Sequence, residues 1–177
     1  LERKLASLED EIAICAVHVE LATVWREQLD DRDKALEHLE SGVDADPMSR
    51  DALMPLAHHY MSIEAWIKAM PLLERIPDVV NAEDEPRVMA SIHRKLARCA
   101  KELLDYDRAL DEYRLASEHL PDDPMIQRGL GGLYYRQSEW AQSETAYEAF
   151  LRLAGDDLSD EDFVRVNLRL GECALKN

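Results

Sequence analysis

The chain has 177 residues and a formal net charge of −16, from 37 acidic and 21 basic side chains. Apolar residues make up 46% of it and charged residues 33%, a composition that suits a folded domain with a sizeable core. So acidic a chain is a poor partner for nucleic acid or anionic lipid, and no apolar run reaches the roughly 20 residues that span a bilayer. We therefore expect neither nucleic-acid binding nor membrane insertion.

Only 6 glycines and 7 prolines leave little room for turns, which favours long helices. A helical pattern recurs in five steps, each a leucine, a small residue and, three positions later, an aromatic residue or alanine. The steps are Leu21, Ala22, Trp25; Leu56, Ala57, Tyr60; Leu96, Ala97, Ala100; Leu130, Gly131, Tyr134; and Leu170, Gly171, Ala174. Such positions share one helical face, so each step predicts a buried stripe. The leucines are 35, 40, 34 and 40 residues apart, which indicates a structural repeat.

A second helix with its own stripe follows each of the first four steps. These stripes are Ala35, Leu39, Gly42; Ala69, Leu73, Ile76; Ala109, Tyr113, Ala116; and Ser143, Tyr147, Phe150. Polar turns are expected between the paired helices, at 29–33, 62–65, 103–107 and 137–140. The second helices should end near Pro47, Pro77, Pro121 and Gly155, because proline cannot continue a helix and glycine adopts the conformation of a helix cap.

The two longer steps carry extra residues at 84–89 and 158–163. Asn81 and Ser159 are candidate N-caps, with Asp84 and Asp162 three residues further on. The extra residues are therefore expected to lengthen the first helices.

These elements predict one array over residues 1–177. Residues 1–14 would be the end of a preceding helix and a lead-in, and the chain begins with Leu1, which indicates a processed chain or an excised fragment. The four repeats would span 15–49, 50–83, 84–123 (with an insertion) and 124–157, and 158–177 would form the first helix of a fifth repeat. With no second helix to cover it, that last helix would expose Val164, Leu168, Leu170, Ala174 and Leu175. Self-association through it is expected.

The cysteines Cys15, Cys99 and Cys173 lie in helical patterns, at spacings that match no zinc or redox motif. We expect them to be reduced and buried, which favours a reducing compartment such as the cytoplasm. His58 and His59 are adjacent and so lie on different faces, as ordinary helix histidines rather than metal ligands. The glycine-rich stretch 128–135 falls inside a helix, which argues against a phosphate-binding loop. No cofactor or metal is expected.

The repeated pattern resembles the tetratricopeptide repeat, a helix-turn-helix unit of about 34 residues. The copy at 90–123 matches best, through Leu96, Ala97, Tyr106, Ala109, Tyr113, Ala116 and Pro121. Ser143 stands in place of the usual alanine and Ala100 in place of the usual aromatic residue. The resemblance implies an all-α, right-handed superhelical solenoid of antiparallel helix pairs, with four full repeats plus a terminal helix. It also implies a non-catalytic scaffold or adaptor, whose first helices line a concave groove that binds proteins or peptides.

Helical angles predict which side chains face that groove. At about 100° per residue, positions two before, two after and five after each stripe leucine point away from the buried side. From these positions and their neighbours we expect a groove formed by Met54, His58, Met61, Arg94, Arg98, Lys101, Arg128, Tyr135, Arg165 and Arg169. It would be apolar in its N-terminal half and basic in its C-terminal half, which predicts an acidic or carboxylate-bearing ligand. The close cations Arg94, Arg98, Lys101 and Arg128 are expected to repel one another. The alternative is a charged face that is merely solvated.

Part of this patch resembles the carboxylate clamp of some tetratricopeptide domains. By that resemblance Arg94 and Arg98 stand at the clamp's lysine and asparagine, Gly129 at its second asparagine, and Arg165 and Arg169 at its final lysine and arginine. Both asparagines are missing, so the resemblance implies an acidic ligand rather than a true clamp. Two other functions stay open: a regulatory or substrate-binding segment of a larger enzyme, and a self-assembling structural array.

Overall fold

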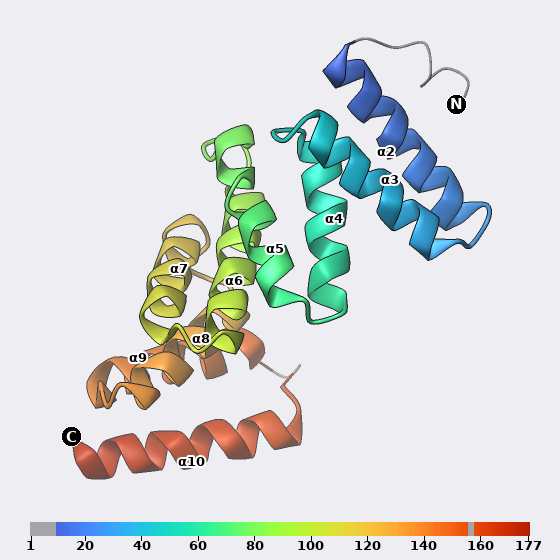
Figure 1. Ribbon diagram of the computed structural model, residues 1–177. Coiled ribbons are helices and arrows are strands. Elements are labelled where there is room, and N and C mark those ends of the chain that lie inside the picture. Colours follow the sequence, from blue (N-terminus) through green and yellow to red (C-terminus); the bar gives the residue numbers. More distant parts are fainter. Residues whose placement is uncertain (1–9, 156–157) are drawn as a thin grey trace. The chain divides into compact units, whose positions relative to one another are not determined.

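The computed structural model describes residues 10–155 and 158–177. Within them lie nine α-helices and one 3-10 helix, and no strand (Figure 1). The α-helices are α2 (Glu11–Glu27), α3 (Arg32–Ala45), α4 (Arg50–Ser62), α5 (Trp66–Leu73), α6 (Pro86–Glu102), α7 (Tyr106–His119), α8 (Pro124–Arg136), α9 (Trp140–Ala154) and α10 (Asp160–Lys176), and the 3-10 helix η1 is Ile76–Val79. The predicted all-α class is confirmed.

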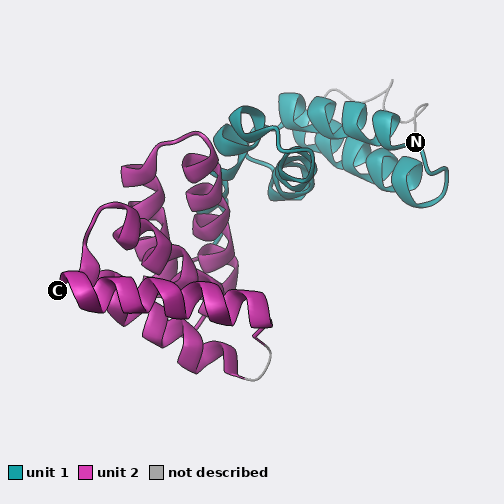
Figure 2. Ribbon diagram, turned by 90° about the horizontal axis from the view of Figure 1, so that it is seen from below, with its two compact units in different colours: residues 1–81 teal, residues 82–177 magenta. Residues whose placement is uncertain are grey.

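The chain divides into two compact units, one ending at Asn81 and the other beginning at Ala82 (Figure 2). In unit 1, α2 packs against α3 and α4 against α5. In unit 2, α6 packs against α7 and α8 against α9, while α10 packs on α9. Each unit is thus built of helix pairs, as the repeat predicts. The predicted end of a preceding helix falls, in residues 1–9, outside the described residues.

The predicted stripes form the contacts between helices. Every residue of the four second-helix stripes is buried, including Ser143, whose hydroxyl donates to the Gly131 carbonyl over 2.9 Å. In α2, α4, α6 and α8 the stripe leucine and the small residue after it are also buried. The helical period alone therefore located these contacts, because burial in a helix pair follows that period.

Unlike the other stripes, that of α10 is largely uncovered, as expected for Leu170 and Ala174 of the last helix. Leu170 is half-buried there, and Gly171 and Ala174 are exposed. The buried residues of this helix are Val166 and Cys173. Helix α10 packs on α9, and its Asp162 and Glu172 side chains also reach Arg128 and Tyr135 of α8.

The four turns within the helix pairs share one backbone geometry. Asp30, Glu64, Leu104 and Ser138 have positive φ angles of 51°, 59°, 66° and 63°. In all four turns the next residue donates its N–H to the carbonyl of the final stripe residue, as in Ala65 to Tyr60 over 2.8 Å. None of the four is glycine, so each turn carries the steric cost of the left-handed conformation.

The predicted helix ends are partly confirmed. Pro47 and Pro121 directly follow the C-caps of α3 and α7, and Gly155 caps α9 with φ 54°. The prediction for Pro77 is wrong, because α5 already ends at Leu73 and Pro77 lies inside η1. A proline near the start of a helical turn has no N–H that needs a partner, so η1 accepts it.

The predicted start of α10 is confirmed and that of α6 is wrong. The Ser159 hydroxyl accepts the N–H of Asp162 over 3.2 Å and caps α10. Helix α6 begins at Pro86 after Glu85, not near Asn81, because proline at the first helical position has its φ preset for a helix. Both helices have 17 residues, against 13 in α4 and α8, so the extra residues do lengthen first helices.

Candidate functional site

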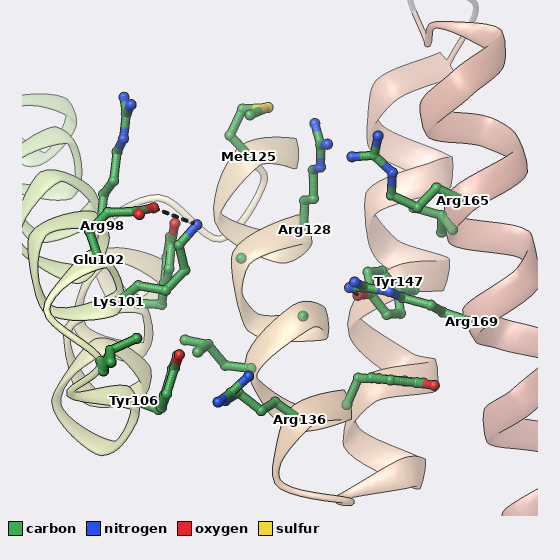
Figure 3. Close-up of a pocket in the computed structure, with 17 residues that line it drawn as sticks. Arg98, Lys101, Glu102, Tyr106, Met125, Arg128, Arg136, Tyr147, Arg165 and Arg169 are labelled. Atoms are coloured by element: carbon green, nitrogen blue, oxygen red, sulfur yellow. Dashed lines mark hydrogen bonds and ion pairs between the residues drawn. The ribbon is translucent and has the colours of Figure 1, made fainter. Parts of the chain in front are cut away.

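A cavity of about 990 Å³ opens in unit 2, along the first helices α6, α8 and α10. We call it the basic cavity, because six of its lining residues are cationic: Arg98, Lys101, Arg128, Arg136, Arg165 and Arg169. Among the described residues that line the cavity, the acidic one is Glu102. Figure 3 shows these side chains coming from three different helices around one space. A strongly acidic chain thus concentrates positive charge at one place.

The basic cavity brings together six of the ten predicted groove residues. They are Arg98, Lys101, Arg128, Tyr135, Arg165 and Arg169. Arg94 is not among the lining residues and lies 3.7 Å from an Asp123 carboxylate oxygen instead. Met54, His58 and Met61 lie on α4 in unit 1, with His58 exposed and both methionines half-buried.

The predicted repulsion among the groove cations is largely relieved by carboxylates. Arg128 holds Asp162 through two N–H groups, with Nη2 to Oδ1 at 2.6 Å and Nη1 to Oδ2 at 3.1 Å. Lys101 lies 3.3 Å from Glu102, and Arg94 pairs with Asp123. The expectation of four mutually repelling cations is therefore wrong. Asp123 caps α8 and Asp162 lies in the first turn of α10, places where helices favour negative charge.

Aromatic rings form the other part of the cavity wall. The Arg169 guanidinium lies 5.2 Å from the centre of the Tyr135 ring and donates a hydrogen bond to the Tyr147 hydroxyl. The Arg136 guanidinium stacks on Tyr106, 3.7 Å from the ring centre. Burial raises the pKa of Tyr147 above its ordinary value. Cations over aromatic rings remain able to bind a ligand anion, because the ring does not neutralise their charge.

Gly129 lines the cavity at the position where the carboxylate clamp has its second asparagine. A β-carbon added there would lie 2.3 Å from Cζ of Tyr113, which is buried. Burial also raises the pKa of Tyr113 above its ordinary value. An asparagine at 129 would collide with the tyrosine ring, so the resemblance to the clamp does not extend to this position.

Sequence reasoning did not place Tyr106, Glu102, Met125 or Asp162 at this site. Tyr106 begins a second helix, and the groove positions were counted only along first helices. Asp162 reaches Arg128 across 34 residues of sequence, a distance over which one helical period carries no information. A usable signal was its place in the acidic first turn of a lengthened helix.

The cysteines and histidines provide no second site. Cys15, Cys99 and Cys173 are free and buried, as predicted. Over residues 10–155 and 158–177, no three His, Cys, Asp or Glu side chains lie together in a way that could hold a metal ion. In the same residues, no helix is both long and apolar enough to cross a bilayer.

Comparisons with known proteins agree with the repeat fold. No family model matches the chain. The chain is 32% identical over 143 residues to the general transcriptional corepressor ssn6 of Schizosaccharomyces pombe, covering 80% of this chain and 12% of that protein. It is 28% identical over 131 residues to the general transcriptional corepressor trfA of Dictyostelium discoideum, covering 73% of this chain and 9% of that protein. The chain therefore spans about a tenth of the length of each relative.

A crystal structure of MamA, a tetratricopeptide-like helical solenoid, superposes with a TM-score of 0.71. The match covers 92% of this chain and 81% of MamA at 18% identity, a level that speaks for the fold alone. The paired helices, the phase of their stripes and these relatives lead to one conclusion: the chain is an array of tetratricopeptide repeats.

Proposed function

We propose that the chain is a non-catalytic interaction module whose basic cavity binds an acidic or carboxylate-bearing peptide of a partner protein. The observation that carries the proposal is the convergence of six cations from α6, α8 and α10, in a chain of net charge −16. Scattered charges on solvated faces would not line one cavity. Its relatives and structural neighbours are corepressors and a solenoid, which also fits a binding role.

The cavity offers an acidic peptide two kinds of contact. Guanidinium groups hold carboxylates with paired hydrogen bonds, each worth about 1.5–3 kcal/mol when partly desolvated and much less when wet. The rings of Tyr106 and Tyr135, with Met125, give apolar surface beside those charges. A ligand with acidic groups flanking an apolar side chain would use both.

The test is charge reversal on α6. Arg98→Glu combined with Lys101→Glu changes two cavity residues on the exposed face of that helix. The matched control is Arg87→Glu with Arg152→Glu, which makes the same charge change at two exposed positions of unit 2 that do not line the cavity. The probe is a fluorescein-labelled peptide of alternating glutamate and aspartate, read by anisotropy.

We expect the cavity variant to bind the probe at least about tenfold more weakly, and the control to bind almost as the unchanged protein does. Added salt should weaken binding, because exposed charges are screened within about 8 Å at physiological ionic strength. Equal losses in the two variants would show that the probe senses only net charge, and the proposal would fail.

A second proposed function is self-association through α10. Val164, Leu168 and Leu175 are 56%, 66% and 88% exposed, and together they form an apolar stripe on the side opposite the buried Val166 and Cys173. A helix that is apolar on two sides gains by covering both. Analytical ultracentrifugation should show a concentration-dependent oligomer that Leu168→Glu with Leu175→Glu abolishes. Sedimentation as a monomer at every concentration would refute this function.

A further inference from the structure

The strongest contact at the basic cavity is one that the protein makes with itself. Asp162, in the first turn of α10, holds Arg128 of α8 through both carboxylate oxygens, at 2.6 and 3.1 Å. The same carboxylate lies 3.8 Å from Arg165, whose other partner is Glu161. Two adjacent acidic side chains therefore meet two of the six cavity cations.

These contacts resemble what the proposed ligand would make. An acidic peptide would place carboxylates on the same guanidinium groups, and paired hydrogen bonds to a planar guanidinium are the geometry it would use. We infer, on the basis of the proposed function, that Glu161 and Asp162 occupy the cation site in the free protein. The ligand is then a peptide with two adjacent acidic residues that displaces them.

Exposure makes this displacement feasible. The side chains of Arg128 and Asp162 are 30% and 23% exposed, and those of Arg165 and Glu161 are 48% and 79% exposed. Ion pairs that reach water contribute little net stability, so exchanging one carboxylate for another costs little. The ligand gains in addition from Arg98, Lys101 and Arg136, which also line the cavity.

Releasing the acidic pair need not unwind α10. The helix start is held by Ser159, whose hydroxyl accepts the N–H of Asp162 and whose carbonyl accepts the N–H of Phe163 over 2.9 Å. Neither bond uses the Asp162 carboxylate. The carboxylate can therefore leave Arg128 by side-chain rotation while the helix keeps its cap.

The internal pair also sets the specificity. A ligand with a single carboxylate replaces one of the two internal contacts and leaves the other cation facing a competing acid. A ligand with two adjacent acids replaces both. The protein should therefore bind peptides with paired acidic residues more tightly than peptides with isolated ones, because only the former replace both internal carboxylate contacts.

The test compares Asp162→Asn with Asp160→Asn in the full chain. Asp160 lies in the same helical turn, so the control loses the same charge at the same favourable place near the helix start. In the control, Asp162 keeps its hydrogen bonds with Arg128. The probes are fluorescein-labelled peptides with the two acids adjacent (Gly-Glu-Asp-Gly) or separated (Glu-Gly-Gly-Asp). Thermal unfolding of each variant checks that α10 stays folded.

We expect Asp162→Asn to bind the adjacent-acid peptide about tenfold more tightly, and Asp160→Asn to bind it as the unchanged protein does. This gain in affinity should vanish when Arg128→Gln is added, because Asp162 and the peptide then no longer compete for a guanidinium group at position 128. If Asp162→Asn binds with equal or lower affinity, the pair is only a structural clamp and the inference is overturned while the proposed function stands. If none of the proteins binds either probe, both are overturned.

Discussion

The ring of Tyr113 on α7 occupies the space where a β-carbon on Gly129 of α8 would lie, with Cζ only 2.3 Å from that position. A second ring, Tyr147 of α9, approaches Gly131 in the same way, at 2.7 Å. Helix α8 is thus held between the second helices on its two sides through glycines that accept whole rings. Because Gly129 and Gly131 have no side chains, the two tyrosine rings can approach the α8 backbone this closely.

Alanine substitutions at two glycines of α8, Gly129 and Gly132, should change the free energy of unfolding in opposite directions. Gly129→Ala should lower the free energy of unfolding by about 1–3 kcal/mol, because the buried Tyr113 ring must shift. Gly132→Ala should raise it by about 0.5–1 kcal/mol, because its β-carbon would meet only Arg169 and Tyr147 atoms at 3.6 Å and alanine favours a helix. Urea denaturation measures both. Equal effects would mean that the Tyr113 ring moves aside freely.

The stripe leucines should be the costliest positions to truncate. Leu96→Ala should destabilise the protein by about 2–5 kcal/mol, since Leu96 is buried in α6 and the change leaves a cavity. Leu175→Ala is the matched control, because Leu175 is 88% exposed. It should change stability by less than about 0.5 kcal/mol. A denaturation midpoint that Leu96→Ala leaves unchanged would contradict the assigned helix phase.

The fold could be predicted where burial follows one helical period. It could not be predicted where a helix start or the packing of the last helix decides the structure. The stripes of the helix pairs were found because each lies against a helix of the same unit, as Leu73 and Tyr147 show. The start of α6 was misplaced, because Pro86 is a stronger helix start than Asn81. In α10 the buried residues are Val166 and Cys173, which the helical period of the leucine stripe did not identify.

The candidate site was predictable to a similar degree. Arg98, Lys101 and Arg128 were placed by angle along single helices, and all three line the cavity. The charge partners of Arg94 and Arg128 were missed, because Asp123 and Asp162 come from the starts of other helices. Sequence periodicity shows which side of a helix a residue faces and not which distant residue lies opposite it.

The left-handed turns offer a way to stabilise the chain. Glu64→Gly should raise the free energy of unfolding by about 0.5–1 kcal/mol, because glycine relieves the strain at φ 59° and the Glu64 side chain is exposed. The control is Ile63→Gly, at the preceding residue with φ −102°. It should destabilise, because glycine gains nothing there and adds freedom to the unfolded chain. Stabilisation by both changes would show that the turn is not strained.

Unit 1 should become less stable in mild acid. Burial, and then the nearby His38, lowers the pKa of His18 below its ordinary value of 6.5, and the two Nδ1 atoms lie 3.0 Å apart. The unfolded chain therefore takes up a proton more readily than the folded one. The stabilising contribution is complete above pH 6.5 and is lost as the pH falls towards the lowered pKa of the folded state.

Urea denaturation on either side of pH 6.5 checks this expectation. His18→Gln should flatten the pH dependence, whereas His58→Gln, at an exposed position of the same unit, should leave it intact. A slope that survives in His18→Gln would assign the effect to another group.

The rates at which the buried thiols are modified can report how often individual repeats open. Cys15, Cys99 and Cys173 lie on α2, α6 and α10, one in each of three first helices, and burial raises the pKa of Cys99 to about 11. A thiol reagent attacks the thiolate, so each cysteine should react only when its own helix moves away from its neighbours. Among the described residues, α10 buries only Val166 and Cys173, whereas α6 buries seven residues. Mass spectrometry over a labelling time course should therefore find Cys173 modified before Cys99, and the lag between the two would measure how much the more deeply buried helix resists opening.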